Sequence, residues 1–413
     1  MASKLVPSQY PTISLAMAAA NSGDEIYVSE GVYTDQVILK SGVSLFGIGN
    51  VTVGATSLDN YGATIEIAGV HDVLIDNFNI QGKTSTWWSN VEGLSIRDLG
   101  AVGGTASYNV IVRNCRFTGI YPKPGVANSL GTPIVVTGLG DTRLGHTHAH
   151  DILIENCTFI NNNPTSTAGI TVGYISVIGN VENITIKDCY FYHSAATVGK
   201  IANAVNFSGN YSPSYPATPR YCRVVGCTFE SPYDGIQHQS VYLNVVHDVI
   251  VERNFIDGWG LGPMVAAEAG NLDEFESYNI IIRRNIIKSS NSLAVSVAAW
   301  TSFYKKCYNI WVDSNTIHGD VFLVDINGQE PCTGVLITNN IITSRVNDDY
   351  YRGTYVETNN TSDTEIRIDN LYRDTPDWVV YNTQELDYNG TKQKRTRGAE
   401  EKQWIRRKPV RRY

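Results

Sequence analysis

Charged side chains and long apolar segments are both scarce in this sequence. Lys, Arg, Asp and Glu together make up 17% of the 413 residues, and no apolar run approaches the roughly 20 residues that a membrane-spanning helix requires. The N-terminal stretch MASKLVPSQYPTISLAMAAANSGD has no basic segment followed by a continuous apolar one, so we expect no signal peptide. Helical periodicity is missing beyond one short Ala-rich N-terminal segment. The sequence therefore predicts no membrane span, and its 36 Gly and 24 Tyr fit a turn-rich β protein.

A twelve-residue phrase recurs along most of the chain. Eight clear copies start at residues 71, 108, 150, 182, 247, 278, 308 and 333, and a degenerate copy, YCRVVGCTFES, lies around Cys222. With that copy included, the phrase returns every 25 to 42 residues. Copies such as HDILIENCTFIN and YNIIIRRNIIKS alternate apolar and polar residues on either side of a polar corner, which predicts two short strands joined by a turn. Self-similarity at this period indicates a repeat architecture in place of a single globular core.

Aligned copies of the phrase place chemically similar residues at the same position. One apolar position holds Ile80, Phe117, Phe159, Phe191, Phe229, Ile256, Ile287, Ile317 and Ile342. Another holds Phe78, then Cys115, Cys157, Cys189 and Cys227, and then Asn254, Asn285, Asn315 and Asn340. Such uniform columns predict coils that stack one strand spacing apart, with the amides hydrogen-bonded from coil to coil.

This pattern resembles the right-handed parallel β-helix superfamily, whose members include pectate lyases, polygalacturonases, pectin methylesterases and many phage tailspikes. The opening residues TISLAMAAANSGDEIYVSEGVYTDQVILKSGVSLFGIG are similar to the start of that fold in pectin methylesterases and tailspikes. The resemblance implies an all-β chain, a right-handed parallel β-helix (solenoid) of about 10 to 12 coils with an N-terminal capping helix. We expect the cap in residues 1–23, the β-helix domain in 24–372 and a C-terminal segment in 373–413. The fold alone does not define a function.

The seven cysteines do not define the redox compartment. Four of them share one inward column, where disulfides are conceivable on spacing alone, but parallel side chains point the wrong way for easy bridging. We expect buried thiols, a common environment for free cysteine.

The longest loops of the predicted coils come before Cys222. They carry flat side chains on which sugar rings can lie, including Trp87, Trp88 and Tyr121. Packing within the loops and contacts between subunits would use the same residues. Ligand binding and structural packing are therefore alternative roles of these aromatic residues.

A third strand is expected in each coil, in segments such as GITVGY, AVNFSG, GIQHQS and LAVSVAA. Taking alternate residues as outward gives one polar row of Thr171, Asn206, Gln237 and Ser296, and a second row of Thr137, Ser208, Gln239 and Glu268. Amides and hydroxyls arranged in this way suit polyhydroxylated ligands through paired donors and acceptors. A solvent-exposed strand face has the same composition, so both interpretations stand.

Enzymes that cleave sugars on this fold need carboxylates that converge at one point, or a base beside a cation. Asp234 and Glu268 are the candidate catalytic residues here. The sequence departs from the family patterns, because the N-T-D, D-D, G-H-G and R-I-K stretches of polygalacturonases do not appear on successive coils. Gln237 and Gln239 lack the Asp pair of pectin methylesterases, and the third-strand rows lack the acidic cluster of pectate lyases. No catalytic residue is therefore carried over from these families.

The run LGHTHAHD places His146, His148 and His150 at alternate positions. His150 falls at the position of His71 and Tyr108 in other copies, a turn that starts each strand, so the repeat explains it. His146 and His148 are left as weak metal-ligand candidates. The sequence indicates no cofactor, and calcium is compatible with the fold without being indicated by these residues.

The segment 392–413 differs in charge from the rest of the chain. It holds ten Lys or Arg and two Glu, so it carries +8 while residues 1–391 carry −16. Such segregation suggests an interaction tail that docks on an acidic protein surface, and a disordered, solvated end is the alternative. The residues expected to bind a partner are Trp404, Arg406, Arg407, Lys408, Arg411 and Arg412. Nucleic acid is a poor candidate, because the acidic body would repel a duplex.

These observations lead to three hypotheses about function. The first is a tailspike-like protein of a virion or cell surface that binds, and in one version cleaves, host or environmental polysaccharide and is anchored through its terminal segment. The second is a polysaccharide lyase or glycoside hydrolase, and the third is a structural decoration or spike protein without a ligand. A homotrimer would follow from the tailspike analogy alone. We expect a virion or extracellular location.

Overall fold

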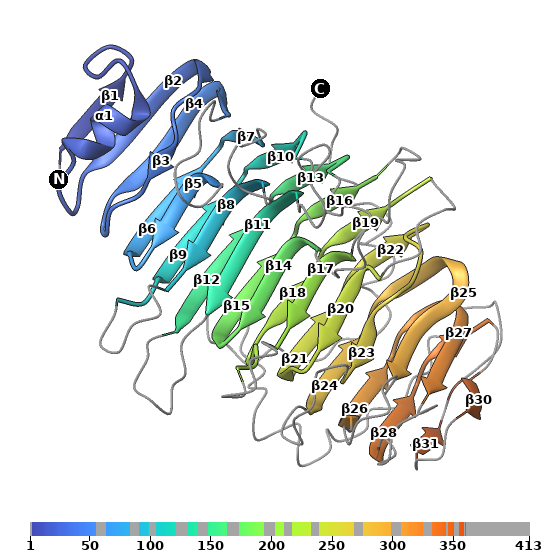
Figure 1. Cartoon of the computed structure of the whole chain (residues 1–413). Coiled ribbons are helices and arrows are strands. Elements are labelled where there is room, and N and C mark those ends of the chain that lie inside the picture. The colour runs from blue at the N-terminus through green and yellow to red at the C-terminus, as the bar shows by residue number, and fades with distance from the viewer. Residues whose placement is uncertain are drawn as a thin grey trace.

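The chain winds into a stack of coils, each paired with the coils before and after it (Figure 1). The structure is a computed structural model that describes residues 2–54, 63–82, 91–98, 105–120, 131–138, 148–162, 173–193, 203–209, 217–232, 239–267, 276–298, 307–324, 333–343, 346–350, 355–358 and 360. The pairings between these described strands are parallel. Parallel neighbours need a crossover connection, and one full turn of the winding supplies it.

Three parallel sheets run along the stack, named here A, B and C. Sheet A holds β1 (Ser3–Val6), β2 (Glu25–Tyr33), β4 (Ser44–Val53), β6 (His71–Asp76), β9 (Tyr108–Arg113), β12 (Ala149–Glu155), β15 (Val181–Lys187), β18 (Arg223–Val225), β21 (His247–Glu252), β24 (Ser277–Arg283), β26 (Cys307–Asp313), β28 (Thr333–Thr338) and β31 (Tyr355–Thr358). Sheet B holds β7 (Asn79–Gln81), β10 (Arg116–Thr118), β13 (Thr158–Ile160), β16 (Tyr190–Tyr192), β19 (Thr228–Glu230), β22 (Phe255–Asp257) and β29 (Ile341–Ile342). Sheet C holds β3 (Val37–Ile38), β5 (Ala63–Ala68), β8 (Val91–Arg97), β11 (Gly131–Gly138), β14 (Gly173–Gly179), β17 (Asn203–Ser208), β20 (Val241–Asn244), β23 (Met264–Ala266) and β30 (Val346–Tyr350). β25 (Ile286–Ala298) and β27 (Thr316–Val324) contribute to both B and C.

The corners between strands explain why Asn and Asp recur in the phrase. Asn156 links sheets A and B with φ 50°, and Asp151 opens its copy of the phrase with φ 54°. Asn and Asp adopt this left-handed region more readily than other residues with a side chain. Corner side chains also bond along the stack, since Asn279 Nδ2 donates to Asp248 Oδ1 at 3.0 Å. The predicted polar corner is confirmed, and its residue types follow from the backbone conformation.

The predicted columns are buried inside the coils. The rings of Phe117, Phe159, Phe191 and Phe229 stack with centroids 4.8 to 4.9 Å apart, the spacing of neighbouring strands. The four column cysteines are buried free thiols, as expected.

The column that changes from thiol to amide keeps one hydrogen-bonding role throughout. Cys227 Sγ lies 3.7 Å from the Ile186 carbonyl of the previous coil, and Asn254 Nδ2 donates to the equivalent Val224 carbonyl at 3.0 Å. From Asn254 onwards each amide also donates to the next amide oxygen. This ladder runs through Asn254, Asn285, Asn315, Asn340 and Asn360. The predicted coil-to-coil amide stack is confirmed.

A short helix lies at the N-terminal end of the stack (Figure 1). Helix α1 (Ile13–Ala18) begins at Thr12, whose side chain accepts from the Leu15 N–H. Ile13, Ala16 and Met17 are buried in the same core as the coils. The first strand β1 precedes the helix and pairs with β2. The division of the chain at residues 23 and 372 stays a prediction.

The strand register of sheet C differs from the sequence prediction in two coils. Asn206 and Ser296 do share a row, as expected, but Ser176 of β14 and Tyr242 of β20 stand beside Asn206. The predicted strands GITVGY and GIQHQS were placed too early in the sequence, because YISVIG and SVYLN alternate equally well and bury Ile175 and Val241 opposite Val205. Gln239 precedes β20 and bridges to Leu261, so its place in the row of Ser208 was wrong.

Candidate functional site

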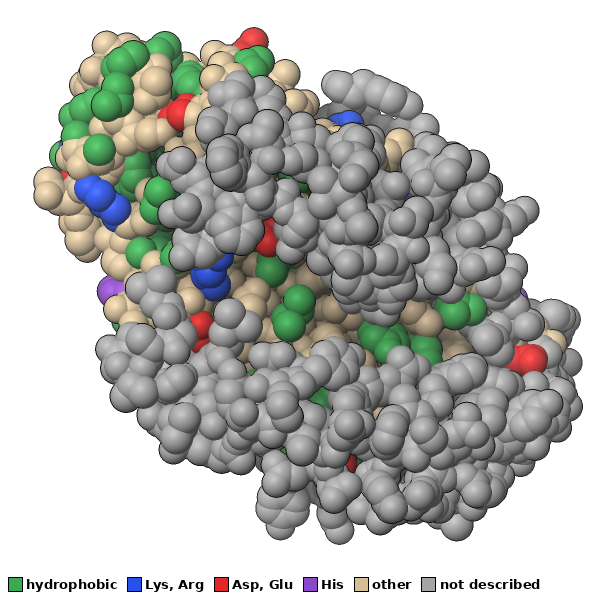
Figure 2. Space-filling view, viewed as in Figure 1, with side chains coloured by type: hydrophobic (Ala, Val, Ile, Leu, Met, Phe, Trp, Pro, Cys, Tyr) green, Lys and Arg blue, Asp and Glu red, His purple; other side chains and the backbone are tan. Residues whose placement is uncertain are grey.

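The outer face of sheet C is the candidate functional site. Figure 2 shows the molecule hollowed over the middle of the stack, with hydrophobic, basic and acidic side chains visible in the hollow. Figure 1, drawn from the same side, places strands β8 to β20 of sheet C in that region. Val135, Thr137 and Ile178 project between inward Ile134, Val136 and Val177 and are half-buried.

A row of outward side chains crosses this face from strand to strand. Its members occupy equivalent register positions and lie about one strand spacing apart. The row contains Glu66, Ser95, Val135, Ser176, Asn206, Tyr242, Met264 and Ser296. Glu66 is its charged member, Ser95, Ser176, Asn206 and Ser296 are uncharged polar members, and Tyr242 and Met264 stand side by side between Asn206 and Ser296.

The middle of the row carries polar atoms without partners. Asn206 is 1% exposed, and neither its Nδ2 nor its Oδ1 has a hydrogen-bonding partner. Asn203 Nδ2 on the same strand and Ser240 Oγ beside β20 are also buried without a hydrogen-bonding partner. Four of the nine such atoms in the described part of the chain therefore gather at β17 and β20. Because an unmet buried amide destabilises a fold, this concentration makes the region of β17 and β20 the candidate for binding another group.

An apolar cluster adjoins these polar atoms. Tyr242, Met264 and Ala266 pack together apart from the main core and are 4%, 5% and 0% exposed. Met264 Sδ also accepts from Gln239 Nε2 at 3.1 Å, and the Gln239 backbone N–H donates to Asn203 Oδ1. Gln239 thus borders the site without belonging to the row in which the sequence placed it.

Glu66 is the N-terminal charged member of the row, and Arg97 and Glu92 lie near it on β8 at other register positions. Arg97 forms a partly buried ion pair with Glu66 Oε1, while Glu66 Oε2 has no partner. Burial raises the pKa of Glu66, an effect that Arg97 opposes. Burial also raises the pKa of the half-buried Glu92 to about 7, with smaller opposing effects from Ser95 and Arg97. The negative charge of Glu66 adds slightly to the rise in the pKa of Glu92, so the two carboxyl groups of sheet C influence each other.

The sequence did not single out this acidic group. Glu66 lies in ATIEIA and Glu92 in VEGLSIR, segments that precede the first third strand considered in the sequence. The alternation in ATIEIA, with Glu66 between inward Ile65 and Ile67, is the signal that would have found it.

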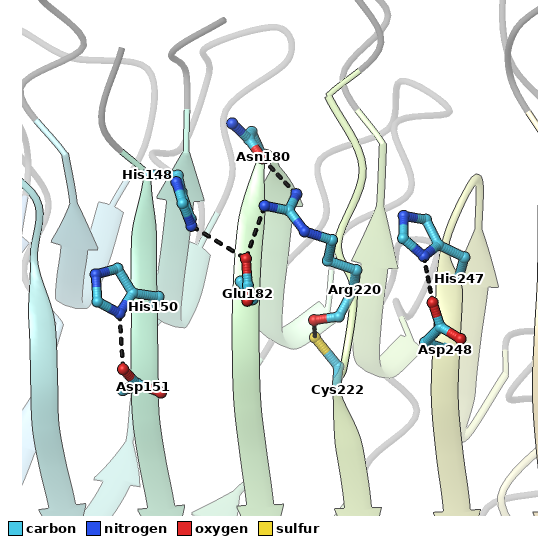
Figure 3. Close-up of polar contacts among 9 residues, drawn as sticks. All are labelled: His148, His150, Asp151, Asn180, Glu182, Arg220, Cys222, His247 and Asp248. Atoms are coloured by element: carbon cyan, nitrogen blue, oxygen red, sulfur yellow. Dashed lines mark hydrogen bonds and ion pairs between the residues drawn. The ribbon is translucent and has the colours of Figure 1, made fainter. Parts of the chain in front are cut away.

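A second polar cluster lies away from this face, at the start of the sheet A strands (Figure 3). Arg220 donates to Glu182 Oε2 and to Asn180 Oδ1, both at 2.7 Å. His148 Nε2 lies 3.2 Å from the same Glu182 oxygen. Burial and then the Arg220 charge lower the pKa of His148, which favours the neutral ring. The four groups satisfy one another, so the cluster is accounted for by structure.

This cluster interrupts a ladder of flat rings along the strand-start corner. His71, Tyr108 and His150 stack on one side of it, with centroids 4.6 and 5.1 Å apart. His150 Nδ1 lies 2.8 Å from Asp151 Oδ2, the contact that His247 makes with Asp248 (Figure 3). His150 thus serves the coil corner, as the repeat alignment predicted.

Most sequence-predicted site residues lie outside the described residues. These are Trp87, Trp88, Tyr121, His146, Thr171, Asp234, Gln237, Glu268 and the tail residues Trp404, Arg406, Arg407, Lys408, Arg411 and Arg412. Among the described residues Asn206 lies in the middle of the site and Gln239 at its border, while His148 lies in the sheet A cluster.

No metal centre is formed within the described part of the chain, where no three His, Cys, Asp or Glu side chains gather in a suitable way. The same residues include no helix of the length and hydrophobicity that crossing a membrane requires.

Comparison with known proteins gives the fold. No protein-family model and no curated protein sequence matches the chain. Solved structures do match. The polygalacturonase from Erwinia carotovora ssp. carotovora has a TM-score of 0.52 at 16% identity, over 87% of this chain and 95% of that one. This chain is a right-handed parallel β-helix.

Two other β-helix structures are similar to the same extent. The A-module of the Azotobacter vinelandii mannuronan C-5 epimerase AlgE6 has a TM-score of 0.52 at 14% identity, over 85% of this chain and 93% of that one. The Streptococcus pneumoniae surface adhesin PfbA has a TM-score of 0.52 at 13% identity, over 84% and 86%. Identities this low establish the β-helix and leave its function to the site.

Proposed function

We propose that this β-helix binds a polysaccharide along the outer face of sheet C. The observation that carries the proposal is the Asn206 carboxamide, which is buried in the middle of that face with no hydrogen-bonding partner. A carboxamide offers N–H donors and an acceptor oxygen side by side, which matches two adjacent sugar hydroxyls. The parallel strands repeat this face along the stack, as a polymeric ligand requires.

The similar solved structures support the proposal of polysaccharide binding. A polygalacturonase, a mannuronan epimerase and a surface adhesin share the β-helix at TM-scores of 0.52. Within the proposal the protein belongs to a virion or cell surface, as a tailspike-like protein anchored by its basic segment 392–413. The support for that attachment is the charge of +8 in this segment against −16 in residues 1–391.

The test is polysaccharide binding by the full chain, measured on a glycan array and then by calorimetry. Asn206→Leu removes the donors and the acceptor at similar volume and should weaken binding at least about tenfold. Ser208→Ala is the matched control, because Ser208 lies on the same strand with its Oγ directed to the Gly209 carbonyl at 3.4 Å. Binding that Asn206→Leu leaves unchanged would contradict the proposed site.

A second candidate function is cleavage of the bound polysaccharide. It is favoured by Glu92, whose pKa of about 7 suits a general acid or base, beside Glu66 and Arg97. Incubation with polysaccharides should then yield new reducing ends or unsaturated products, and Glu92→Gln should abolish them. Asp234→Ala and Glu268→Ala test the sequence-predicted catalytic residues in the same assay. A product yield that Glu92→Gln does not change would rule out this role of Glu92.

A further inference from the structure

The part of sheet C around β17 and β20 combines two properties that single out a kind of sugar. Asn206 provides an unmet donor and acceptor, and the register places Tyr242 directly beside it on the next strand. Tyr242 in turn packs against Met264 and Ala266 in an apolar cluster outside the main core. A ligand group that bonds Asn206 therefore lies within one or two strand spacings of three apolar side chains, which are themselves 4%, 5% and 0% exposed.

The charges on this face make an anionic ligand unfavourable. Within the described strands of the outer row, the side chains from Ser176 to Ser296 are uncharged. The charged member of the row is Glu66 at its N-terminal end, which is already paired with Arg97, and the half-buried Glu92 on β8 adds a further acidic group near it. A sugar carboxylate at β17 would be buried without a cationic partner among these residues, which is costly.

We propose that the subsite at β17 and β20 takes an uncharged sugar that presents adjacent hydroxyls and a methyl group, of the 6-deoxyhexose class. Two neighbouring hydroxyls bond Asn206, one accepting from Nδ2 and the other donating to Oδ1. The methyl group at the sixth carbon packs on Tyr242, Met264 and Ala266. This inference rests on the proposed polysaccharide binding and names the sugar that the site selects.

The preference for a 6-deoxyhexose depends on the group at the sixth carbon of the sugar. A hexose places a hydroxyl, and a uronate a carboxylate, where the 6-deoxyhexose has a methyl group. In this cluster Met264 Sδ already receives Gln239 Nε2, and a thioether sulfur is a weak acceptor for a further hydroxyl. A methyl group buried there gains the ordinary apolar transfer free energy, whereas a polar group loses hydration.

The experiment uses the full chain and two matched ligand series that differ only at the sixth carbon. One is 6-deoxyglucose, glucose and glucuronate, and the other is 6-deoxygalactose, galactose and galacturonate, each displayed as short oligosaccharides and measured by calorimetry. The deoxy sugar should bind about fivefold more tightly than the hexose in at least one series, from the burial of one methyl group. The uronate should bind at least about tenfold more weakly than the hexose.

Variants separate the two contacts. Asn206→Leu should weaken the deoxy sugar and the hexose alike, by at least about tenfold. Met264→Gln should remove the preference by weakening the deoxy sugar to the affinity of the hexose, and Ser208→Ala should alter neither the preference nor the affinities. Thermal unfolding of each variant shows that it is folded before binding is compared.

The outcomes distinguish this inference from the function on which it rests. Saccharide binding that favours uronates, or a deoxy preference that survives Met264→Gln, would overturn the inference and leave polysaccharide binding in place. Failure of every saccharide to bind would overturn both.

Discussion

The side-chain amide of Asn285 donates to Asn315 Oδ1 at 2.9 Å and to the Val251 carbonyl at 3.0 Å. Its own Oδ1 accepts from the backbone N–H and the side-chain amide of Asn254, at 2.9 and 3.0 Å. Both protons and both lone pairs of this buried side chain are therefore used by the coils on either side.

Asn285→Ala should destabilise the protein by about 3 to 5 kcal/mol, because it leaves several buried polar groups unsatisfied at about 1 to 3 kcal/mol each. Asn285→Cys should cost clearly less, because Cys189 and Cys227 hold the same column with a thiol directed at the equivalent carbonyl. Unfolding in denaturant, followed by circular dichroism, measures both. Equal losses for the two variants would show that the column needs volume alone.

Asn206→Leu should raise the free energy of unfolding by about 1 to 2 kcal/mol, since it removes a buried amide that makes no hydrogen bond. Ser176→Ala on the neighbouring strand should lower it, because Ser176 Oγ accepts from the Gly173 N–H at 2.8 Å. Thermal unfolding of the ligand-free variants tests the opposite signs. Destabilisation by Asn206→Leu would mean that the amide has partners in the free protein.

The Glu92 carboxyl should make the protein less stable as the pH rises. Burial raises its pKa from 4.5 to about 7, so the folded state keeps a proton that the unfolded chain releases above pH 4.5. Stability should therefore decline between about pH 4.5 and 7 by at most about 3 kcal/mol and then level off. Glu92→Gln should flatten this part of the curve of unfolding free energy against pH. An unchanged curve would contradict the raised pKa.

Glu252 provides a comparison with the opposite sign. Burial opposes its ionisation, but Arg283, with Nε 2.8 Å from Glu252 Oε2, outweighs it together with the charges of Arg253 and Arg223 and holds the pKa below 4.5. The stabilisation is present above pH 4.5 and is lost as the pH falls through the lowered pKa. Glu252→Gln should cost about 3 kcal/mol at pH 7 and much less in acid. A loss that does not depend on pH would point to packing as the cause.

The six buried cysteines should be inert in the folded protein. They are free thiols inside the coils, and burial raises the pKa of Cys222 to about 12, which suppresses the reactive thiolate. A thiol reagent at pH 8 should leave these six unmodified until denaturant is added, as peptide mapping can show. Reducing agents should not change the melting temperature. Fast native labelling at any of the six would contradict this packing.

The stacking of the coils could be predicted in detail from the phrase, because each copy repeats the same inward positions. The Phe117 to Phe229 stack, the thiol column and the Asn254 to Asn340 ladder all follow from aligned residues. Backbone conformation and burial act on every copy alike, so sequence periodicity reports them directly.

The candidate site was predicted only in part. Asn206 and its row partner Ser296 were found, but the register near β14 and β20 was wrong, because the loops between sheets B and C vary in length and alternation alone fits two registers. The partnerless state of Asn206 and the raised pKa of Glu92 depend on burial by residues distant in the sequence. Such effects leave no local signal.

The amide ladder also shows what kind of change the chain tolerates. Successive rungs from Asn254 to Asn340 are separated by 31, 30 and 25 residues, yet each repeats the same bonds to its neighbours. The hydrogen bonds of the ladder therefore depend on the number of coils and not on the number of residues in each coil. Deleting or duplicating one whole coil would restore every rung, so the outer face of sheet C can be lengthened or shortened without a change to the interior.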